Sequence, residues 1–472
     1  MREGFLYSSQ TIRNIFTDVG AGFSDSESIT HIATSSEEID TGGFFIPLLG
    51  NRDGHEFIPS ALSRGAVLFL CERNHPILEK ISPEDRKKAI FVKNTLRALG
   101  KIAEFHRMRY RPLVLGITGS SGKTTTKEIL GMSLSYLPFD ELVITEKNYN
   151  NEIGVPFTIF KIHKQTRIVI IEMGMNHSGE ISRLTRMAKP HHVILTGIGP
   201  SHIENLGSLE AIAYAKSEIM EGMFKGGNFY LPTGIKYLEI FQKHAKKRNL
   251  NFKLFQLKDS DSIKLIERSA EGYILEVFGE KVEWKIPVYK ILENLTAVVD
   301  LVSDLGFDKK EVANKLKAYQ STNRRNVILE KELTLLDDTY NANPDSMISS
   351  LQSLVHVGSG KDCYAILGDM KELGSYSEKY HKKVGKIAAE LGLKGLIGFG
   401  ADSNFIVTSY MKHFRESKFA VQFEDSEDSI QKIRDLLKSN LKQGDIVLIK
   451  GSRSMKMERI VESIKEIGFV NE

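Results

Sequence analysis

The sequence predicts an α/β fold built from open, mostly parallel sheets. Short runs of four or five consecutive apolar residues each stop at polar or glycine-rich text, which is typical of strands buried on both faces. Amphipathic stretches of helical length separate these runs, and this alternation indicates repeated βαβ units. The runs are "RPLVLGIT" (111–118), "TRIVIIEMG" (166–174), "HHVILTG" (191–197), "LTLLDDT" (333–339), "YAILGDM" (364–370) and "DIVLIKG" (445–451).

The chain of 472 residues is too long for one hydrophobic core, because single cores stop growing beyond about 250 to 300 residues. We therefore expect three domains, comprising residues 1–92, 93–322 and 323–472. The first boundary precedes the helix-like stretch "NTLRALGKIAEFHRMRY", and the second lies in the polar stretch "YQSTNRRN". Residues 236–290 carry no motif that indicates a function.

Composition excludes several classes of protein. With 26% charged residues, 41% apolar residues and a net charge of +4, the chain is globular and too mildly basic to indicate a nucleic-acid partner. Cys71 and Cys363 lie far apart without C-x-x-C or zinc spacing, so neither a disulfide framework nor a metal cluster is indicated. The first residues lack the apolar core of a signal peptide, and no run approaches the ~20 apolar residues of a membrane span. We expect a soluble, intracellular protein.

The stretch "GITGSSGKTTTKE", residues 116–128, follows the first apolar run. Its glycines are spaced more closely than in the common phosphate-binding loop, G-x-x-x-x-G-K-[ST]. Backbone N–H groups at the start of a helix can still cup phosphate oxygens, while Lys123 supplies positive charge and Thr124 a hydroxyl for Mg²⁺. An ordinary Gly/Ser turn is the alternative, but it does not require a lysine. The predicted phosphate site comprises Gly119, Ser120, Ser121, Gly122, Lys123, Thr124 and Thr125.

Polar residues also follow the next two runs, where ligands of open α/β sheets bind. Glu172 ends "IVIIE", and a carboxylate at this edge suits a divalent metal that holds phosphates, although a capping or solvated glutamate is equally compatible. His202, in "GIGPSHIENLG", lies in a glycine-bounded loop before a helix. A loop histidine is more often a surface residue, but the position at the same sheet edge favours function.

The segment "SLEAIAYAKSEIMEGMF", residues 208–224, is predicted to be one helix. Lys216 lies in the middle of its apolar stripe at 3.6 residues per turn, a position that lysine normally avoids. One explanation is a snorkelling side chain at the edge of a core. The other is a desolvated amine with a lowered pKa, neutral enough to react with CO₂ and form a metal-binding carbamate. The stripe comprises Leu209, Ile212, Ile219, Met220 and Met223.

Five motifs together resemble the Mur ligases, the ATP-dependent amino-acid and peptide ligases of peptidoglycan synthesis. They are "TGSSGKTTTKE", "NYNNEIGVP", "EMGMNHSGEI", "AKSEI" and "DDTYNANPDSM", and they occur in the family's order. The segments "YNANPDS" and "GNRDGHEFIPSALSRGA" are most similar to the members that add D-alanyl-D-alanine to UDP-N-acetylmuramoyl-tripeptide. The D-N-P-R element of the member that adds meso-diaminopimelate does not occur in this sequence.

The resemblance implies an N-terminal domain for the UDP-substrate, a central ATP-binding domain with a P-loop-type sheet, and a C-terminal Rossmann-like ligase domain. It implies a cytoplasmic monomer that binds UDP-MurNAc-tripeptide, D-alanyl-D-alanine, ATP and two Mg²⁺ ions. The implied reaction forms an acyl phosphate, which the incoming amine attacks. Two alternatives stay open: another ligase of the superfamily, adding a different amino acid or acting on folate, and a nucleotide-binding relative without turnover.

The resemblance also implies roles for individual residues. Lys123 and Thr124 match phosphate and Mg²⁺ contacts, Glu172 and His202 match metal-site residues, and Lys216 matches the lysine that is carbamylated in the family. Asn294, in "YKILENLTAVV", matches the adenine contact. Arg325, or its neighbour Arg324, and Asp338 match nucleotide contacts brought in by the third domain. Asn150, Asn151, Asn341 and Asn343 match positions that contact the substrate peptide.

Overall fold

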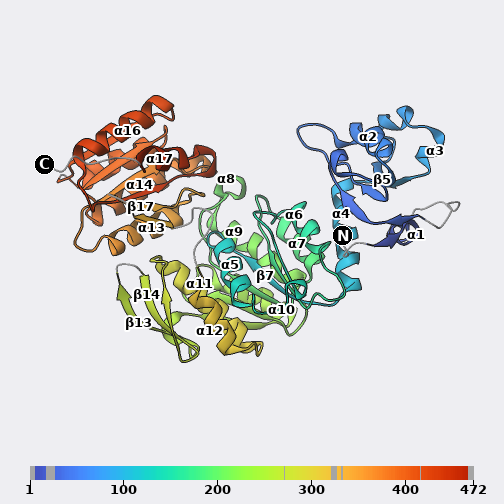
Figure 1. The fold of residues 1–472 in the computed structure, drawn as a ribbon, viewed down its shortest axis with the longest axis horizontal. Helices are drawn as coiled ribbons and strands as arrows, with labels where there is room; N and C mark the ends of the chain where they lie inside the picture. The colour runs from blue at the N-terminus through green and yellow to red at the C-terminus, as the bar shows by residue number, and fades with distance from the viewer. Residues whose placement is uncertain are drawn as a thin grey trace.

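The computed structural model describes residues 6–16, 27–269, 272–319, 327–330, 333–414 and 416–465. The chain forms three α/β bodies, and the central body lies between the N-terminal and C-terminal ones (Figure 1). The predicted α/β fold with mostly parallel sheets is confirmed. Within the described ranges, no helix combines the length and the apolar character that crossing a bilayer requires.

The N-terminal body is a four-stranded parallel sheet in the order β3-β4-β5-β6, next to an antiparallel pair of short strands. The run "AVLFLCE" of β5 is buried along most of its length, as expected for an inner parallel strand. The strands are β1 (Tyr7–Ser8), β2 (Ser28–Ile29), β3 (His31–Ala33), β4 (Gly43–Phe45), β5 (Ala66–Glu72) and β6 (Ala89–Val92), and the helices are α1 (Ser9–Arg13), η1 (Ser36–Glu38), η2 (Gly54–Phe57), α2 (Ile58–Ser63), η3 (Pro76–Lys80) and α3 (Pro83–Arg86), η marking 3₁₀ turns.

Two stacked imidazoles and one carboxylate close the loop that follows β4. The rings of His55 and His75 have centroids 4.2 Å apart, and Asp53 accepts from Nδ1 of the first ring at 2.7 Å and Nε2 of the second at 2.9 Å. The other ring nitrogens accept the backbone N–H groups of Glu72 and Ile77, each at 3.2 Å. A neutral imidazole that accepts at one nitrogen carries its proton on the other. The nitrogens facing Asp53 are therefore donors, and the cluster braces the loop instead of ligating a metal.

The central body contains a six-stranded parallel sheet in the order β12-β11-β10-β7-β9-β8. Three predicted apolar runs form β9, β7 and β10, which lie side by side in the sheet. The strands are β7 (Leu113–Thr118), β8 (Leu142–Ile144), β9 (Ile168–Glu172), β10 (His192–Leu195), β11 (Asn228–Pro232) and β12 (Asn251–Phe255). The helices are α4 (Thr95–Arg109), α5 (Lys123–Ser133), η4 (Phe139–Glu141), α6 (Gly154–Ile159), α7 (Glu180–Ala188), α8 (Ile203–Leu206), α9 (Leu209–Ser217), η5 (Glu218–Glu221), α10 (Leu238–Arg248), η6 (Leu257–Asp259), α11 (Tyr289–Asp304) and α12 (Lys309–Lys317).

Part of the stretch without a functional motif forms a second, antiparallel sheet of β13 (Ile263–Ser269), β14 (Gly272–Val277) and β15 (Glu280–Trp284). Its apolar face belongs to the same buried cluster as α11 and α12. Trp284 is 1% exposed and stacks on Tyr319 with ring centroids 5.2 Å apart. This small sheet therefore extends the core of the central body beyond its main sheet.

The C-terminal body has a six-stranded sheet in the order β16-β17-β21-β18-β19-β20, parallel except for β16. The other three predicted runs form β17, β21 and β18, again as neighbours. The strands are β16 (Val327–Glu330), β17 (Thr334–Asp337), β18 (Cys363–Gly368), β19 (Gly395–Phe399), β20 (Phe419–Phe423) and β21 (Ile446–Lys450), and the helices are α13 (Pro344–Val357), η7 (Gly374–Tyr376), α14 (Ser377–Glu390), α15 (Ser403–His413), α16 (Glu427–Asn440), η8 (Arg453–Met455) and α17 (Glu458–Ile464).

The predicted domain boundaries stay predictions. The first, after residue 92, coincides with the end of β6, and α4 begins three residues later and packs against α6 and α7 of the central body. The second, after residue 322, lies outside the described residues.

A buried guanidinium fastens α4 to the central body. Arg107 is 1% exposed and donates to the carbonyl oxygens of Ala188 and Tyr110 at 3.0 Å and of Pro112 and Lys189 at 3.3 Å. These carbonyls belong to the end of α4 and the end of α7, so one side chain joins both segments.

We predict that Arg107→Met lowers the free energy of unfolding by about 3 kcal/mol, because the apolar stem is kept while several buried carbonyls lose a charged donor. Urea unfolding followed by far-UV circular dichroism measures the change. Lys101→Met, an exposed site on the same helix, is the control and should change the value by less than about 0.5 kcal/mol. Equal effects of the two substitutions would contradict the structural role of Arg107.

Candidate active site

A cavity of about 930 Å³ opens where the carboxyl ends of strands from two sheets meet. On the central side it is lined from the segments after β7, β9 and β10 and from the start of α11. On the C-terminal side it is lined from the segments after β17 and β21 and from α13. The predicted site residues that line it are Ser120, Ser121, Gly122, Lys123, Thr124, Thr125, Asn150, Glu172, His202, Asn294, Asp338, Asn341 and Asn343.

Three predicted residues that the structure describes do not line this cavity, namely Gly119, Asn151 and Lys216. Asn151 is exposed, and its Oδ1 accepts the backbone N–H groups of Ile153 and Gly154 at 3.1 and 2.8 Å at the start of α6. Arg324 and Arg325 lie outside the described residues.

The loop between β7 and α5 has the geometry of an anion cradle. Gly122, at φ 81°, precedes the first residue of α5 and supplies no side-chain cap, so the N–H groups of the first turn point at the cavity. Gly119 has φ 148°, and a Cβ there would lie 2.0 Å from Oγ1 of Thr196. Lys123 Nζ donates to the carbonyl of Gly119 at 2.9 Å, which folds the lysine over the loop. The short glycine spacing thus still produces a turn whose N–H groups could bind an anion.

Glu172 holds a carboxylate oxygen next to this loop without a hydrogen bond. The side chain is 1% exposed, and its Oε1 accepts from Thr124 Oγ1 at 3.1 Å and Asn150 Nδ2 at 2.8 Å. Its Oε2 is buried and has no hydrogen-bond donor among the described residues, with Lys127 Nζ 3.8 Å away. A buried carboxylate oxygen beside a threonine hydroxyl fits a small divalent cation, which prefers oxygen ligands.

Lys216 is almost completely buried, and its predicted position in an apolar stripe is confirmed by the buried neighbours Ile212 and Ile219. Burial lowers the pKa of its amine well below the usual range, and the positive charge of Lys123 lowers it further. The prediction of one helix over residues 208–224 is wrong, because α9 ends at Ser217 and a 3₁₀ turn follows.

A contact with α7 accounts for this turn. The carboxylate of Glu218, the first residue of the turn, accepts the backbone N–H groups of Gly179 at 2.8 Å and Ser182 at 3.1 Å. It thereby caps the N-terminus of α7, and a continued α-helix would direct this side chain elsewhere.

Asn294 places an amide with free hydrogen-bonding capacity beside the loop. The side chain is 0% exposed, and neither Oδ1 nor Nδ2 has a hydrogen-bond partner among the described residues. Nδ2 lies 2.4 Å from the position that a Cβ on Gly122 would occupy, so the amide reaches the phosphate loop itself. An amide with one donor and one acceptor matches the N7 and N6 edge of adenine.

A buried ion pair closes the C-terminal side of the cavity. Lys450 Nζ lies 2.5 Å from Asp338 Oδ2 and donates to the carbonyl of Asn341 at 2.9 Å. Ser350 Oγ donates to the same aspartate oxygen at 2.6 Å. The sequence indicated Asp338 but gave no role to Lys450, the last residue of β21.

Asn343 joins the two bodies across the cavity. Its Nδ2 donates to Oγ of Ser121 at 2.8 Å and of Ser201 at 3.1 Å, while its Oδ1 accepts the N–H of Ser346 and caps α13. The segment predicted to contact the substrate peptide therefore also contacts the phosphate loop.

A second contact between the bodies involves His202, whose Nδ1 lies 2.6 Å from Oε2 of Glu372. Sequence reasoning missed Glu372. Its position could have identified it, because Glu372 lies four residues after the end of β18. The site residues that the sequence did identify also lie shortly after strand ends.

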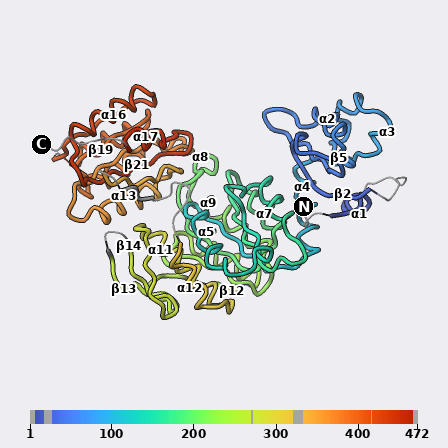
Figure 2. The backbone as a smooth tube through the Cα atoms, viewed as in Figure 1, coloured from blue at the N-terminus to red at the C-terminus, as the bar shows by residue number. Residues whose placement is uncertain are grey.

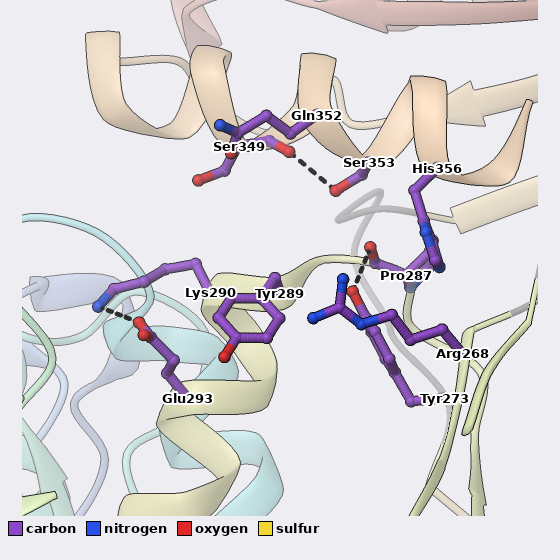
Figure 3. Close-up of a pocket in the computed structure, with 10 residues that line it drawn as sticks. All are labelled: Arg268, Tyr273, Pro287, Tyr289, Lys290, Glu293, Ser349, Gln352, Ser353 and His356. Carbon is purple, nitrogen blue, oxygen red and sulfur yellow. Dashed lines mark hydrogen bonds and ion pairs between the residues drawn. The ribbon is translucent and has the colours of Figure 1, made fainter. Parts of the chain in front are cut away.

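A smaller cavity of about 430 Å³ lies beside the first, between the start of α11 and one face of α13 (Figure 3). Figure 3 shows Tyr289, Lys290 and Glu293 on the α11 side and Ser349 and Gln352 on the α13 side. Lys290, Glu293 and Ser349 line both cavities. No predicted site residue lines the smaller one, which is a branch of the cleft between the bodies.

Comparisons with known proteins cover nearly the whole chain. The profiles described as Mur ligase family, catalytic domain, as Mur ligase middle domain, and as Mur ligase, glutamate ligase domain match residues 28–107, 117–302 and 323–453. A Bacillus subtilis (strain 168) protein named UDP-N-acetylmuramoyl-tripeptide--D-alanyl-D-alanine ligase is 30% identical over 470 residues, 97% of this chain and 98% of the relative.

Solved structures show the same likeness. A crystal structure of MurF from Acinetobacter baumannii has a TM-score of 0.84 at 25% identity and covers 98% of this chain and 99% of that one. The structure of MurF ligase from Thermotoga maritima in complex with ADP has a TM-score of 0.77 at 27% identity, with coverages of 92% and 97%.

We predict that Lys450→Met destabilises the C-terminal body by about 3 to 5 kcal/mol, because it leaves the buried carboxylate of Asp338 without its cation. The double variant Lys450→Met/Asp338→Asn removes both charges and should regain at least about 1 kcal/mol. Urea unfolding measures both, with the exposed Lys438→Met on α16 as control. A neutral effect of Lys450→Met alone would show that the pair is not what holds this edge.

Proposed function

This chain belongs to the Mur ligase family, and from that premise we propose that it is the ATP-dependent ligase that joins D-alanyl-D-alanine to UDP-N-acetylmuramoyl-tripeptide. The full-length likeness to a ligase with this name supports the substrates. The observation that carries the proposal is the contact of Asn343, in "DDTYNANPDSM", with Ser121 of the phosphate loop. It brings the segment most similar to ligases of this specificity to the place where the phosphates bind.

ATP occupies the large cavity in this proposal. The loop from Gly119 to Thr125 holds the phosphates through backbone N–H groups. Lys123 exchanges its hydrogen bond to the carbonyl of Gly119 for a contact with the phosphates and supplies a positive charge there. Asn294 pairs with the adenine edge, and Asp338 contacts the nucleotide from the C-terminal body. The assignment of Arg325, or Arg324, stays a prediction.

Two Mg²⁺ ions are proposed at the edge of the central sheet, held by Thr124, Glu172, His202 and the carbamate of Lys216. The Oε2 of Glu172 supports this assignment, because it is buried without a hydrogen-bond donor and its nearest cation, Lys127 Nζ, is 3.8 Å away, which leaves its lone pairs open to a metal ion. When bound, Mg²⁺ neutralises charge on the transferring phosphoryl group.

The burial of Lys216 supports the proposed carbamate. Its neutral amine attacks CO₂, a C–N bond forms, one C=O electron pair moves to oxygen, and the nitrogen releases a proton to solvent. A buried neutral amine thereby becomes a carboxylate-like anion, which the positive charge of Lys123 favours and which suits a metal site.

The reaction begins when the terminal carboxylate of the tripeptide attacks the γ-phosphorus of ATP and ADP departs. The resulting acyl phosphate is attacked by the amine of D-alanyl-D-alanine, inorganic phosphate leaves, and the nitrogen loses a proton. The protein aligns these groups and lets the cavity exclude water. Asn150, Asn151, Asn341 and Asn343 are the proposed contacts to the peptide portions.

The N-terminal body is proposed to bind the UDP portion of the substrate. The product, UDP-MurNAc-pentapeptide, places the enzyme at the last cytoplasmic step of peptidoglycan precursor synthesis, acting as a monomer without a nucleic-acid partner.

Substrate choice tests the proposal directly. With UDP-MurNAc-tripeptide, ATP and Mg²⁺, D-alanyl-D-alanine should release ADP at least about 100-fold faster than meso-diaminopimelate or single amino acids. ADP release and product mass are measured together. Equal turnover with meso-diaminopimelate, or activity on a folate, would assign the enzyme to another branch of the family. If no amine triggers ADP release, the protein would instead be a nucleotide-binding relative without turnover.

A second prediction concerns Lys216. Lys216→Arg should lose ligation by at least ~100-fold, about 2.7 kcal/mol of transition-state stabilisation, because a guanidinium cannot capture CO₂ and stays charged; far-UV circular dichroism checks that the variant is folded. The exposed Lys225→Arg is the matched control. Removing bicarbonate and CO₂ should lower wild-type activity, with recovery when bicarbonate is returned. A Lys216→Arg enzyme with most of its activity would show that ligation does not need a carbamate at this position.

A further inference from the structure

The contact between His202 and Glu372 joins two unusual backbone positions from different bodies. His202 begins α8 in the central body with φ 59°, and Glu372 follows β18 in the C-terminal body with φ 63°. Left-handed backbone is uncommon for residues with side chains and persists where the surroundings impose it. Two such residues aim their side chains at each other, with Nδ1 and Oε2 only 2.6 Å apart.

The loop that carries Glu372 is fixed within its own body. The N–H of Met370 donates to Nε2 of His381 at 2.9 Å, the N–H of Lys371 donates to Oγ of Ser452 at 2.9 Å, and the N–H of Ser452 donates to the carbonyl of Asp369 at 3.1 Å. The loop therefore presents its glutamate from a rigid platform attached to β18 and to the end of β21.

The same loop grips α8. The carbonyl of Glu372 accepts the N–H of Glu204 at 3.3 Å, and the hydroxyl of Tyr376 donates to the carbonyl of Gly207 at 2.8 Å. The helix α8 contacts η7 of the C-terminal body, and the backbone tube shows it next to that body (Figure 2). The short helix that begins at His202 is thus held at both ends by the C-terminal body.

Structural bracing alone does not explain the ionic contact. The side chains of His202 and Glu372 are 23% and 55% exposed, and part-exposed pairs of this kind add little stability. What the pair does fix is the state of one imidazole. A carboxylate oxygen 2.6 Å from Nδ1 favours the tautomer that carries its proton on that nitrogen, and this tautomer leaves the lone pair of a neutral ring on Nε2.

Metal-binding histidines are commonly oriented in this way by a carboxylate on the nitrogen that does not face the metal. We propose that Glu372 is a positioning residue that completes the metal site from the C-terminal body, by holding Nδ1–H of His202 so that Nε2 receives the metal. This inference rests on the proposed role of His202. Because Glu372 comes from the other body, metal affinity and docking of the two bodies are coupled, and each strengthens the other.

The probe is Mn²⁺, titrated by electron paramagnetic resonance into full-length protein with a non-hydrolysable ATP analogue and bicarbonate. Glu372→Ala is expected to weaken Mn²⁺ binding at least about 10-fold, while Glu378→Gln, an exposed glutamate of the same body, leaves it unchanged. In a His202→Ala background, Glu372→Ala should change Mn²⁺ affinity less than about 2-fold, since it acts only through the histidine.

Solution scattering supplies the reciprocal measurement. Mn²⁺ with the analogue should reduce the radius of gyration of the wild type more than that of Glu372→Ala. Unchanged Mn²⁺ affinity in Glu372→Ala, or equal and additive losses in the two backgrounds, would overturn the proposal. Failure of the proposed function would be seen separately, as absence of D-alanyl-D-alanine ligation by the wild type, whatever the metal titration shows.

Discussion

The site depends on the parallel register of β9, β7 and β10. Pairing of Ile117 with Glu172, and of Thr118 with Leu195, makes the three strands end at the same level of the sheet. Parallel strands need crossover connections, so each strand end opens into a loop and not into a tight hairpin. The loop from Gly119 to Thr125, the carboxylate of Glu172 and the loop before α8 consequently lie side by side. No rearrangement within the central body is needed to bring these groups together.

The C-terminal body follows the same rule with a different result. Its strands β17 and β21 also end at one edge of the sheet. The polar groups at this edge, however, bind mainly to one another, as Asp338 and Lys450 do. Their mutual bonds make the edge stiff. This rigidity matters because the C-terminal body contributes only a few side chains to a site that lies mainly on the central body. Side chains held on a rigid edge lose little conformational entropy when they cross the cleft and bind.

The sequence was sufficient to predict the features that depend on residues close together in the chain or within one sheet. Apolar runs located the central strands, the residues after them located the cavity, and helical geometry identified Lys216 as buried. It was insufficient where two bodies meet. Glu372 and the loop contact of Asn343 depend on how one body sits against the other, which no local period encodes. The early end of α9 was also missed, because Glu218 caps a helix that lies some 40 residues earlier in the chain.

The buried amide of Asn294, which has no hydrogen-bond partner among the described residues, lowers the stability of the protein without nucleotide. An apolar residue of similar shape in its place would avoid burying an unpaired donor and acceptor, so the empty protein is less stable than its own core would permit. In the proposed binding mode, the adenine edge of a bound nucleotide supplies the missing hydrogen-bond partners. Saturation with nucleotide should therefore act as a folding aid, and a cell short of ATP would hold this protein in its most fragile form.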